Sequence, residues 1–370
     1  MIRIDHPLPW NSPGTQRQLS VLHFGQGPRK AYIQAALHAD ELPGMRVAVA
    51  LRQRLTALEA NGQLLGRIEL VPVANPIGLA QVFQSTHQGR FDFASGKNFN
   101  RDFPDLAALI APKLHSLLGD DAADNLALIR ELMVGALQDL PPAGTPLEGL
   151  QRLLLGHACT ADLVLDLHCD FESVLLLYAL PQLWPRLSGL AAHLSAQAAL
   201  LAEDSGGQSF DEACATPWLK LAAAFPDAAI PAACLATTIE LGGMADTEAQ
   251  RAEADAEAIL AFLAEQGFID GSWPNRPEHQ CPATPFAGAQ YAYPPHPGVV
   301  SYLQPLGARV AVGDPLFEVI DPLSGQHSIV RATTDGLLYA RERLRFAQPG
   351  LWLAKVAGAM PIRSGRLLSD

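Results

Sequence analysis

The stretch Lys30–Ala60, KAYIQAALHADELPGMRVAVALRQRLTALEA, holds the pattern that decides the fold. It begins with a short, mostly apolar run of eight residues, which predicts a buried strand. From Met45 to Ala60 the apolar residues recur at helical spacing, and an Asn-Gly pair follows. A strand that passes through a short loop into a helix is the unit from which α/β sheets are built.

The same alternation continues along the first 280 or so residues. Further apolar runs predict strands in RIELVPVAN (67–75), ADLVLDLH (161–168), ESVLLLYAL (172–180) and AACLATTIEL (232–241). Residues 247–266 have the pattern of an amphipathic helix with acidic outer positions. Strands that alternate with helices predict an α/β sandwich with a buried, largely parallel sheet.

Two changes in character divide the chain. Residues 105–157 are rich in leucine and alanine at helical spacing and predict two or three helices, as an insertion into a first domain that spans residues 1–282. The proline-rich stretch 271–285 suits a linker. Beyond it, glycine and proline punctuate short strands, so residues 283–370 are expected to form a small all-β domain.

The composition narrows the class of function. The chain has 370 residues, of which 49% are hydrophobic and 17% are charged, and its net charge of -12 provides no basic stripe for a nucleic acid. Its apolar runs stay short of the ~20 residues that span a membrane. The five cysteines form no CxxC pair, which favours free thiols and a cytoplasmic protein.

Three side chains at strand ends could form a metal site. His38 and Glu41 lie three residues apart where the first strand ends, and His168 closes a later strand. Sites in open α/β sheets gather beyond the carboxyl ends of adjacent strands. Two histidines and one carboxylate leave a position for water, which is the ligand set of a catalytic zinc site. Taken singly, each of these histidines is more often structural.

Other polar residues could complete the chemistry. Glu240 ends an apolar strand, where a carboxylate is costly unless it is paired, solvated or catalytic. The pair Asn100-Arg101 could hold a substrate carboxylate, and Arg90 could polarise a carbonyl, although structural ion pairs are an alternative for both arginines. Asp166 shares a strand face with His168 and could fix its imidazole.

The ordered motifs H-x-x-E (His38, Glu41), N-P (Asn75), N-R-x-F-P (Asn100), D-L-H (Asp166) and E-x-G (Glu240) resemble the succinylglutamate desuccinylase/aspartoacylase family, over roughly residues 30–245. These are the deacylases of the zinc carboxypeptidase clan. The resemblance implies a three-layer α/β/α sandwich with a mixed sheet, and hydrolysis of the amide bond of an N-acyl amino acid.

The resemblance also implies roles for the site residues. His38, Glu41 and His168 would bind one Zn²⁺ per chain, and Glu240 would be the base that activates the zinc-bound water. Arg90 would contact the carbonyl oxygen, and Asn100 with Arg101 would bind the substrate carboxylate. Asn100 lies ten positions after Arg90, and this spacing exceeds the one expected for the family. No tyrosine has a secure role, and Tyr178, Tyr291 and Tyr293 are interpreted as structural.

After the D-L-H motif the chain reads HCDFES, which differs from the small or neutral polar residues usual in the family. If the backbone stays extended, Asp166, His168, Asp170 and Glu172 share one face. Asp170 could then bind a cationic group of the substrate. The alternative is that Asp170 and Glu172 are solvated turn residues.

The last part of the chain, from GARVAVGDPLFEVIDP to VRATTDGLLYA, resembles a biotinyl/lipoyl-type β-barrel. Its turn ATTDG lacks the lysine that carrier domains need, so we expect this domain to shield the pocket or to mediate formation of a homo-oligomer.

The leading hypothesis is therefore a cytoplasmic, zinc-dependent deacylase with a small N-acyl amino acid as substrate and no nucleic-acid or membrane partner. A zinc carboxypeptidase that acts on peptides is an alternative with the same metal and base. A metal-binding regulatory protein that has lost activity is another, and the presence of both Glu41 and Glu240 argues against it.

Overall fold

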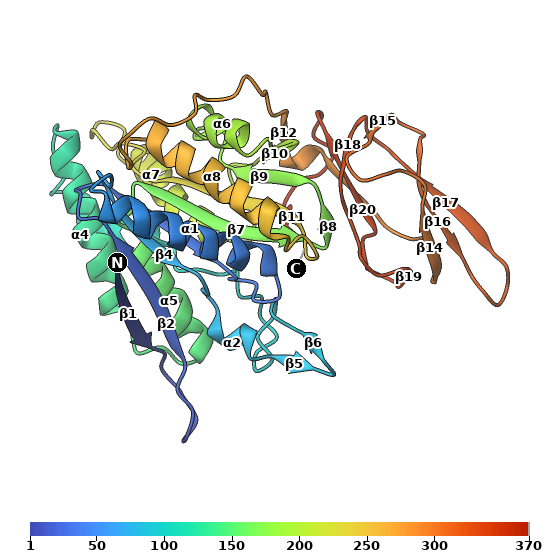
Figure 1. The fold of residues 1–370 in the computed structure, drawn as a ribbon, viewed down its shortest axis with the longest axis horizontal. Helices are drawn as coiled ribbons and strands as arrows, with labels where there is room; N and C mark the ends of the chain where they lie inside the picture. Colours follow the sequence, from blue (N-terminus) through green and yellow to red (C-terminus); the bar gives the residue numbers. More distant parts are fainter. Residues whose placement is uncertain (369–370) are drawn as a thin grey trace.

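The computed structural model describes residues 1–368 and is built around a nine-stranded sheet (Figure 1). In spatial order its strands are β1 (Ile2–Pro7), β2 (Gln18–Phe24), β4 (Arg67–Val71), β3 (Lys30–Ala35), β7 (Leu163–Asp170), β11 (Leu235–Gly243), β9 (Leu175–Ala179), β10 (Ala198–Leu201) and β12 (Ala283–Pro285). The central strands β4, β3, β7 and β11 are parallel, whereas β1, β2 and the pair β11–β9 are antiparallel. The expected α/β fold with a large mixed sheet is confirmed.

Helices cover both faces of this sheet. On one face α1 packs against β3 and β7 and runs beside α8, which also contacts α6 (Figure 1). On the other face α7 packs on β7 and β11 and is flanked by α3 and α5. The helices are α1 (Leu42–Ala60), α2 (Pro76–Leu79), α3 (Leu106–Leu114), α4 (Ala122–Asp139), α5 (Pro146–Ala158), α6 (Trp184–His193), α7 (Phe210–Ala224) and α8 (Ala249–Glu265).

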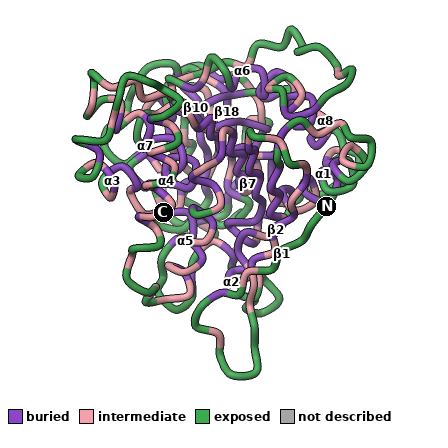
Figure 2. Tube along the Cα trace, turned by 90° about the vertical axis from the view of Figure 1, so that its left-hand side faces the viewer, coloured by how far each residue is buried: buried purple, intermediate pink, exposed green. Residues whose placement is uncertain are grey.

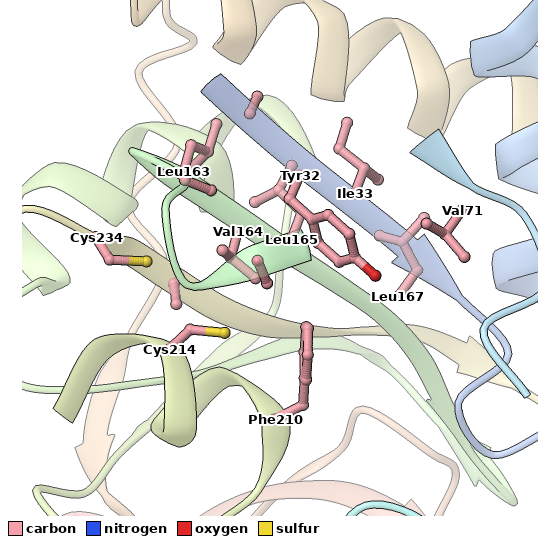
Figure 3. Close-up of a cluster of buried hydrophobic side chains, with 14 of the residues drawn as sticks. Tyr32, Ile33, Val71, Leu163, Val164, Leu165, Leu167, Phe210, Cys214 and Cys234 are labelled. Atoms are coloured by element: carbon pink, nitrogen blue, oxygen red, sulfur yellow. The ribbon is translucent and has the colours of Figure 1, made fainter. Parts of the chain in front are cut away.

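The core lies along the central strands. All eight residues of β7 are buried, and the buried part of the trace is concentrated around this strand (Figure 2). Phe210 and Cys214 point from α7 toward the sheet, where Phe210 lies 5.8 Å from Tyr32, ring centre to ring centre (Figure 3). Burial on both faces explains why β3 and β7 are nearly continuous apolar runs. No helix within residues 1–368 is long and apolar enough to cross a membrane.

The C-terminal residues form two further sheets with a hydrophobic cluster of their own. One contains β13 (Ala289–Ala292), β20 (Ala354–Gly358), β18 (Gly336–Arg341) and β15 (Arg309–Val310). The other contains β17 (His327–Arg331), β16 (Pro315–Ile320), β14 (Gly298–Tyr302) and β19 (Phe346–Ala347). We call residues 289–358 the β module. The linker residues 283–285, placed in this domain from the sequence, instead form β12 of the large sheet.

The β module is joined to the end of β7 by backbone pairing. The chain continues from β7 into β8 (Glu172–Ser173), which pairs antiparallel with β18. Glu172 also forms ion pairs with Arg341, 2.9 Å away, and Arg345, 2.5 Å away. Glu172 therefore turns to the β module and does not share the site with Asp170.

Gly44 lets α1 approach the strand that carries His168. A Cβ atom at Gly44 would lie 2.9 Å from the carbonyl oxygen of Leu167 and 3.2 Å from the Cβ of Ala35. Since both neighbours belong to the central strands, they cannot move away cheaply. The position needs glycine for close approach, although glycine is a poor helix former.

We expect Gly44→Ala to lower the free energy of unfolding by about 1–3 kcal/mol, because overpacking at the helix–strand contact outweighs the gain in helix propensity. Gly156→Ala in α5 is the matched control, since a Cβ atom there meets nothing within 4 Å. That variant should gain up to about 1 kcal/mol. Chemical denaturation measures both, and equal stabilisation by the two changes would contradict this account of Gly44.

Candidate active site

Three elements bring His38, Glu41 and His168 together. His38 lies in the loop after β3, Glu41 is the N-cap residue of α1, and His168 lies near the carboxyl end of β7. Ala36 has a φ of 62°, so the chain turns sharply as it leaves β3. One ligand atom of each of the three residues lies within 4.8 Å of the others, and all three side chains are buried. Within residues 1–368 no other group of this kind meets that limit.

The hydrogen bonds of His38 show that its Nδ1 lone pair faces a carboxylate. The Oδ1 atom of Asn98 accepts the backbone N–H of Asn100, which identifies it as the amide oxygen. His38 Nε2 lies 2.8 Å from this oxygen and must therefore carry the proton. Burial and the nearby Arg90 lower the pKa of His38 to about 4, so the ring is neutral at pH 7. Its Nδ1 lone pair then lies 2.9 Å from Glu41 Oε1.

Two acceptors this close repel unless a cation lies between them. His168 is placed in a similar way, with Nδ1 2.8 Å from Glu41 Oε2 and Nε2 3.0 Å from Asp166 Oδ2, but its ring carries both protons in the metal-free protein. Asp166 is in turn fixed through Oδ1, which accepts from Gln34. Each imidazole is thus held on its outer nitrogen and presents the inner one to Glu41, as in histidine metal ligands. The donor set of two imidazoles and a carboxylate fits Zn²⁺.

In the metal-free protein the negative charge of Glu41 is balanced by protons on its neighbours and by cationic side chains. Burial alone would raise the pKa of Glu41, but the two histidines outweigh it and hold this pKa well below its usual range. Burial alone would lower the pKa of His168, but Asp166 and Glu41 raise it well above its usual value. Arg90 also donates to Glu41 Oε1 at 2.9 Å. His168 must therefore lose a proton when a metal binds.

Glu240 lies beside this cluster on the neighbouring strand. It pairs in register with His168 between β11 and β7, and its Oε2 atom is buried without a hydrogen-bond partner among the described residues. Burial, followed by the negative charge of Glu41, raises the pKa of Glu240 to about 8. A buried carboxyl group with a pKa near neutrality and a vacant acceptor atom has the properties of a general base.

Asn100 and Arg101 form a wall of the site at the start of α7. Asn100 Oδ1 accepts the backbone N–H of Phe210, and Arg101 Nη1 donates to the carbonyl oxygen of Asn100. Gln151, on α5, holds the carbonyl oxygen of Arg101 at 2.6 Å. The helical region 105–157 therefore supports this wall from behind. Burial, then Arg90 and Arg366, lower the pKa of Arg101 to about 10, which leaves it cationic at neutral pH.

These residues line one cavity of about 540 Å³. The part of the chain that forms the large sheet and its loops contributes His38, His168, Glu240, Arg90, Asn100 and Arg101, and the three candidate tyrosines also line the cavity. The β module contributes Trp352 and Lys355, and Arg366 and Leu368 follow from the C-terminal segment. A cavity of this size suits a small molecule.

Asp170 also lines the cavity, and both of its carboxylate oxygens have partners. Oδ1 accepts the backbone N–H of Phe171 at 2.8 Å, and Oδ2 accepts from Lys355 Nζ at 2.7 Å. Although burial lowers it, Asp170 raises the pKa of Lys355 above its ordinary value, so Lys355 is cationic. The negative charge that the sequence predicted at Asp170 is therefore paired with Lys355 of the same chain.

Asn98, Trp352 and Lys355 were missed by the sequence analysis. Asn98 had a local signal, since it precedes Asn100 by two residues in the same polar loop. Lys355 had none, because it lies 185 residues from Asp170 along the chain. Only the pairing of β8 with β18 brings the two together.

The sequence of residues 28–127 matches the model of the succinylglutamate desuccinylase/aspartoacylase catalytic domain. The resemblance to this family is confirmed. The matched segment holds His38, Glu41, Arg90, Asn100 and Arg101, whereas His168 and Glu240 lie beyond it. A search among curated proteins found no match.

Solved structures extend the likeness to the whole chain. A protein from Shewanella amazonensis, named for the succinylglutamate desuccinylase/aspartoacylase family, has 27% identity and a TM-score of 0.84, covering 96% of this chain and 98% of its own. One from Shewanella frigidimarina, named in the same way, has 24% identity and a TM-score of 0.83, covering 96% and 97%. The ectoine utilization protein EutE (DoeB) from Ruegeria pomeroyi shares the fold, with 18% identity, a TM-score of 0.68 and coverage of 96% and 95%.

Asn98→Ala should weaken zinc binding about 10–100-fold, because it removes the acceptor that fixes the tautomer and orientation of His38. Competition with a chromophoric chelator measures this affinity. Asn61→Ala, at the exposed C-cap of α1, is the control and should bind zinc as the wild type does. Unchanged affinity in Asn98→Ala would contradict the role given to Asn98.

Glu240 should make the metal-free protein less stable as the pH rises. Its folded pKa of about 8 lies above the ordinary value of 4.5, so its contribution to stability is complete below pH 4.5 and is lost as the pH rises through 8. We expect the free energy of unfolding of the wild type, relative to Glu240→Gln, to fall between these limits and then to level off. Denaturation at several pH values tests this, and a difference that rises with pH would contradict it.

Proposed function

We propose that this protein hydrolyses the amide bond of an N-acyl amino acid, with one Zn²⁺ per chain as cofactor. The observation that carries the proposal is the meeting of two histidine Nδ1 atoms and the Glu41 carboxylate, each imidazole being fixed through its other nitrogen. The family match over residues 28–127 supports a deacylase.

His38, Glu41 and His168 would hold the metal, which polarises the amide carbonyl and lowers the pKa of water when bound. Glu240 takes a proton from the attacking water with its vacant carboxylate oxygen and passes it to the leaving amine. Glu240 can take this proton only when its carboxyl group is ionised. Positive charge at the neighbouring metal ligands favours the ionised form, because it lowers the pKa of Glu240 below its value in the metal-free protein.

The chain's cations orient the substrate. Arg90 lies against Glu41 at the edge of the cluster, where it can donate to the carbonyl oxygen as charge develops. Arg101 stays cationic although it is buried, and with Asn100 it would bind the carboxylate of the amino acid. Asp166 keeps the His168 ring oriented without contact with the substrate.

A zinc carboxypeptidase would use the same metal and base. We also propose that the fold is related to that of the zinc carboxypeptidases. The small cavity, partly lined by the β module, favours a small N-acyl amino acid over a peptide. An inactive regulatory protein is disfavoured because the ligand residues and Glu240 are all present. The unpaired cysteines favour the cytoplasm. A homo-oligomer formed through the β module remains a prediction.

Glu240→Gln should lower kcat on N-acyl amino acids about 10²–10⁴-fold and retain bound zinc, because the base is lost while the ligands stay. Release of free amine from N-acetyl, N-succinyl and N-formyl amino acids, and from short peptides, measures this activity. Zinc content is measured on the same samples.

Each result separates the alternatives. Turnover of peptides but not of N-acyl amino acids would identify a carboxypeptidase. A zinc-loaded wild type that cleaves neither would support the regulatory protein. Equal activity of Glu240→Gln and wild type would rule out the role given to Glu240.

A further inference from the structure

Lys355 is a buried cation at the corner of the cavity where the β module meets β7. Its Nζ lies 2.7 Å from Asp170 Oδ2 and 3.7 Å from the centre of the Trp352 ring. The side chain also lines the cavity. An ammonium group has three N–H donors. One is directed to Asp170. Among the described residues the other two meet only the rings of Trp352 and Tyr291, whose centre lies 5.2 Å from Nζ, so an acceptor of a bound molecule can take one of them.

The hydrogen-bond partners of Asp170 determine which kind of substrate group can bind at this corner. Its Oδ1 accepts from Phe171 and its Oδ2 from Lys355. A substrate ammonium group would have to displace Lys355 and leave that lysine buried without its partner, which is costly. A group that accepts a hydrogen bond meets no such competition.

Cationic side chains of the protein also lie over the aromatic rings around this corner. The Arg363 guanidinium lies 4.1 Å from the centre of the Tyr291 ring, and Arg343 lies 5.7 Å from that of Phe171. A cationic substrate would therefore compete for rings that these groups already occupy. Residues 283–370 hold eight Lys and Arg against six Asp and Glu, in a chain whose net charge is -12.

We propose that Lys355 is a specificity residue, which donates a hydrogen bond to an acceptor group of the substrate and excludes a substrate ammonium group from this corner. The acceptor is a carboxylate or a neutral carbonyl at the end of either the acyl chain or the amino acid side chain. This inference rests on the proposed function and names the substrate class of the same site. It replaces the expectation that Asp170 binds a cationic substrate.

Two substrate series locate the acceptor. N-acetylglutamate, N-acetylglutamine and N-acetylornithine vary the side chain from anionic to neutral to cationic at similar length. N-succinylalanine and N-valerylalanine compare an acyl chain that ends in a carboxylate with one that ends in a methyl group. In one of the two series the wild type should prefer the substrate with the acceptor group over the substrate without it. The expected preference is about 10–100-fold in kcat/KM, the range of a hydrogen bond to a charged group.

Lys355→Met should remove this preference through KM and raise kcat/KM for the cationic substrate, because Asp170 loses its partner and can bind the ammonium group. The ratio of acceptor to cation turnover should fall at least about tenfold. The double variant Lys355→Met/Asp170→Asn has neither charge, so it should lose the preference for acceptors without gaining the cationic substrate. Arg309→Met removes an exposed cation of the same module and should keep the wild-type ratio.

Parallel loss on every substrate in Lys355→Met would overturn the proposal and leave Lys355 a structural residue. If Lys355→Met fails to fold, the double variant provides the test. A preference for substrates with an acceptor group that survives in the double variant would also overturn the proposal. A wild type that prefers N-acetylornithine also overturns the inference while it supports the proposed function. Absence of turnover on all five compounds would instead count against the proposed function.

Discussion

The site depends on one buried carboxylate. Glu41 meets both histidine Nδ1 atoms, accepts from Arg90 and from the backbone N–H of Cys169, and also begins helix α1. A charge in this position is tolerated only because cations and donors surround it. The same residue thus joins the loop after β3, the end of β7 and the loop that carries Arg90. A metal at this point would take over the balance that a proton on His168 provides in its absence.

The β module belongs to the site as well as to the fold. Its strand β18 pairs with β8, a short continuation of the strand that carries His168. Lys355, on β20, reaches Asp170, two residues beyond that ligand. Paired backbone and a buried ion pair fix the module at this corner more firmly than exposed ion pairs would. The β module therefore contributes Trp352 and Lys355 to the lining of the same cavity as His38 and His168.

The central sheet and the cluster of His38, Glu41 and His168 could be predicted from the sequence, because strands buried on both faces are continuous apolar runs and their ends gather the polar side chains. His168 followed directly from this rule. The start of α1 at Leu42 was missed, since Pro43 and Gly44 resemble a loop although proline suits a first turn and glycine permits close packing. Strand β10, which lies between β9 and the edge strand β12, is only four residues long and had no distinct pattern. The partners of Asp170 could not be predicted, because an ion pair between residues 170 and 355 depends on how two sheets meet.

X-ray absorption at the zinc edge of the metal-loaded protein tests the account of Glu41 most directly, since it reports the atoms bound to the metal. The account predicts two imidazole nitrogens and carboxylate or water oxygens at about 2.0–2.2 Å. A sulfur ligand at about 2.3 Å, which Cys169 could supply, or zinc bound without imidazole would contradict it.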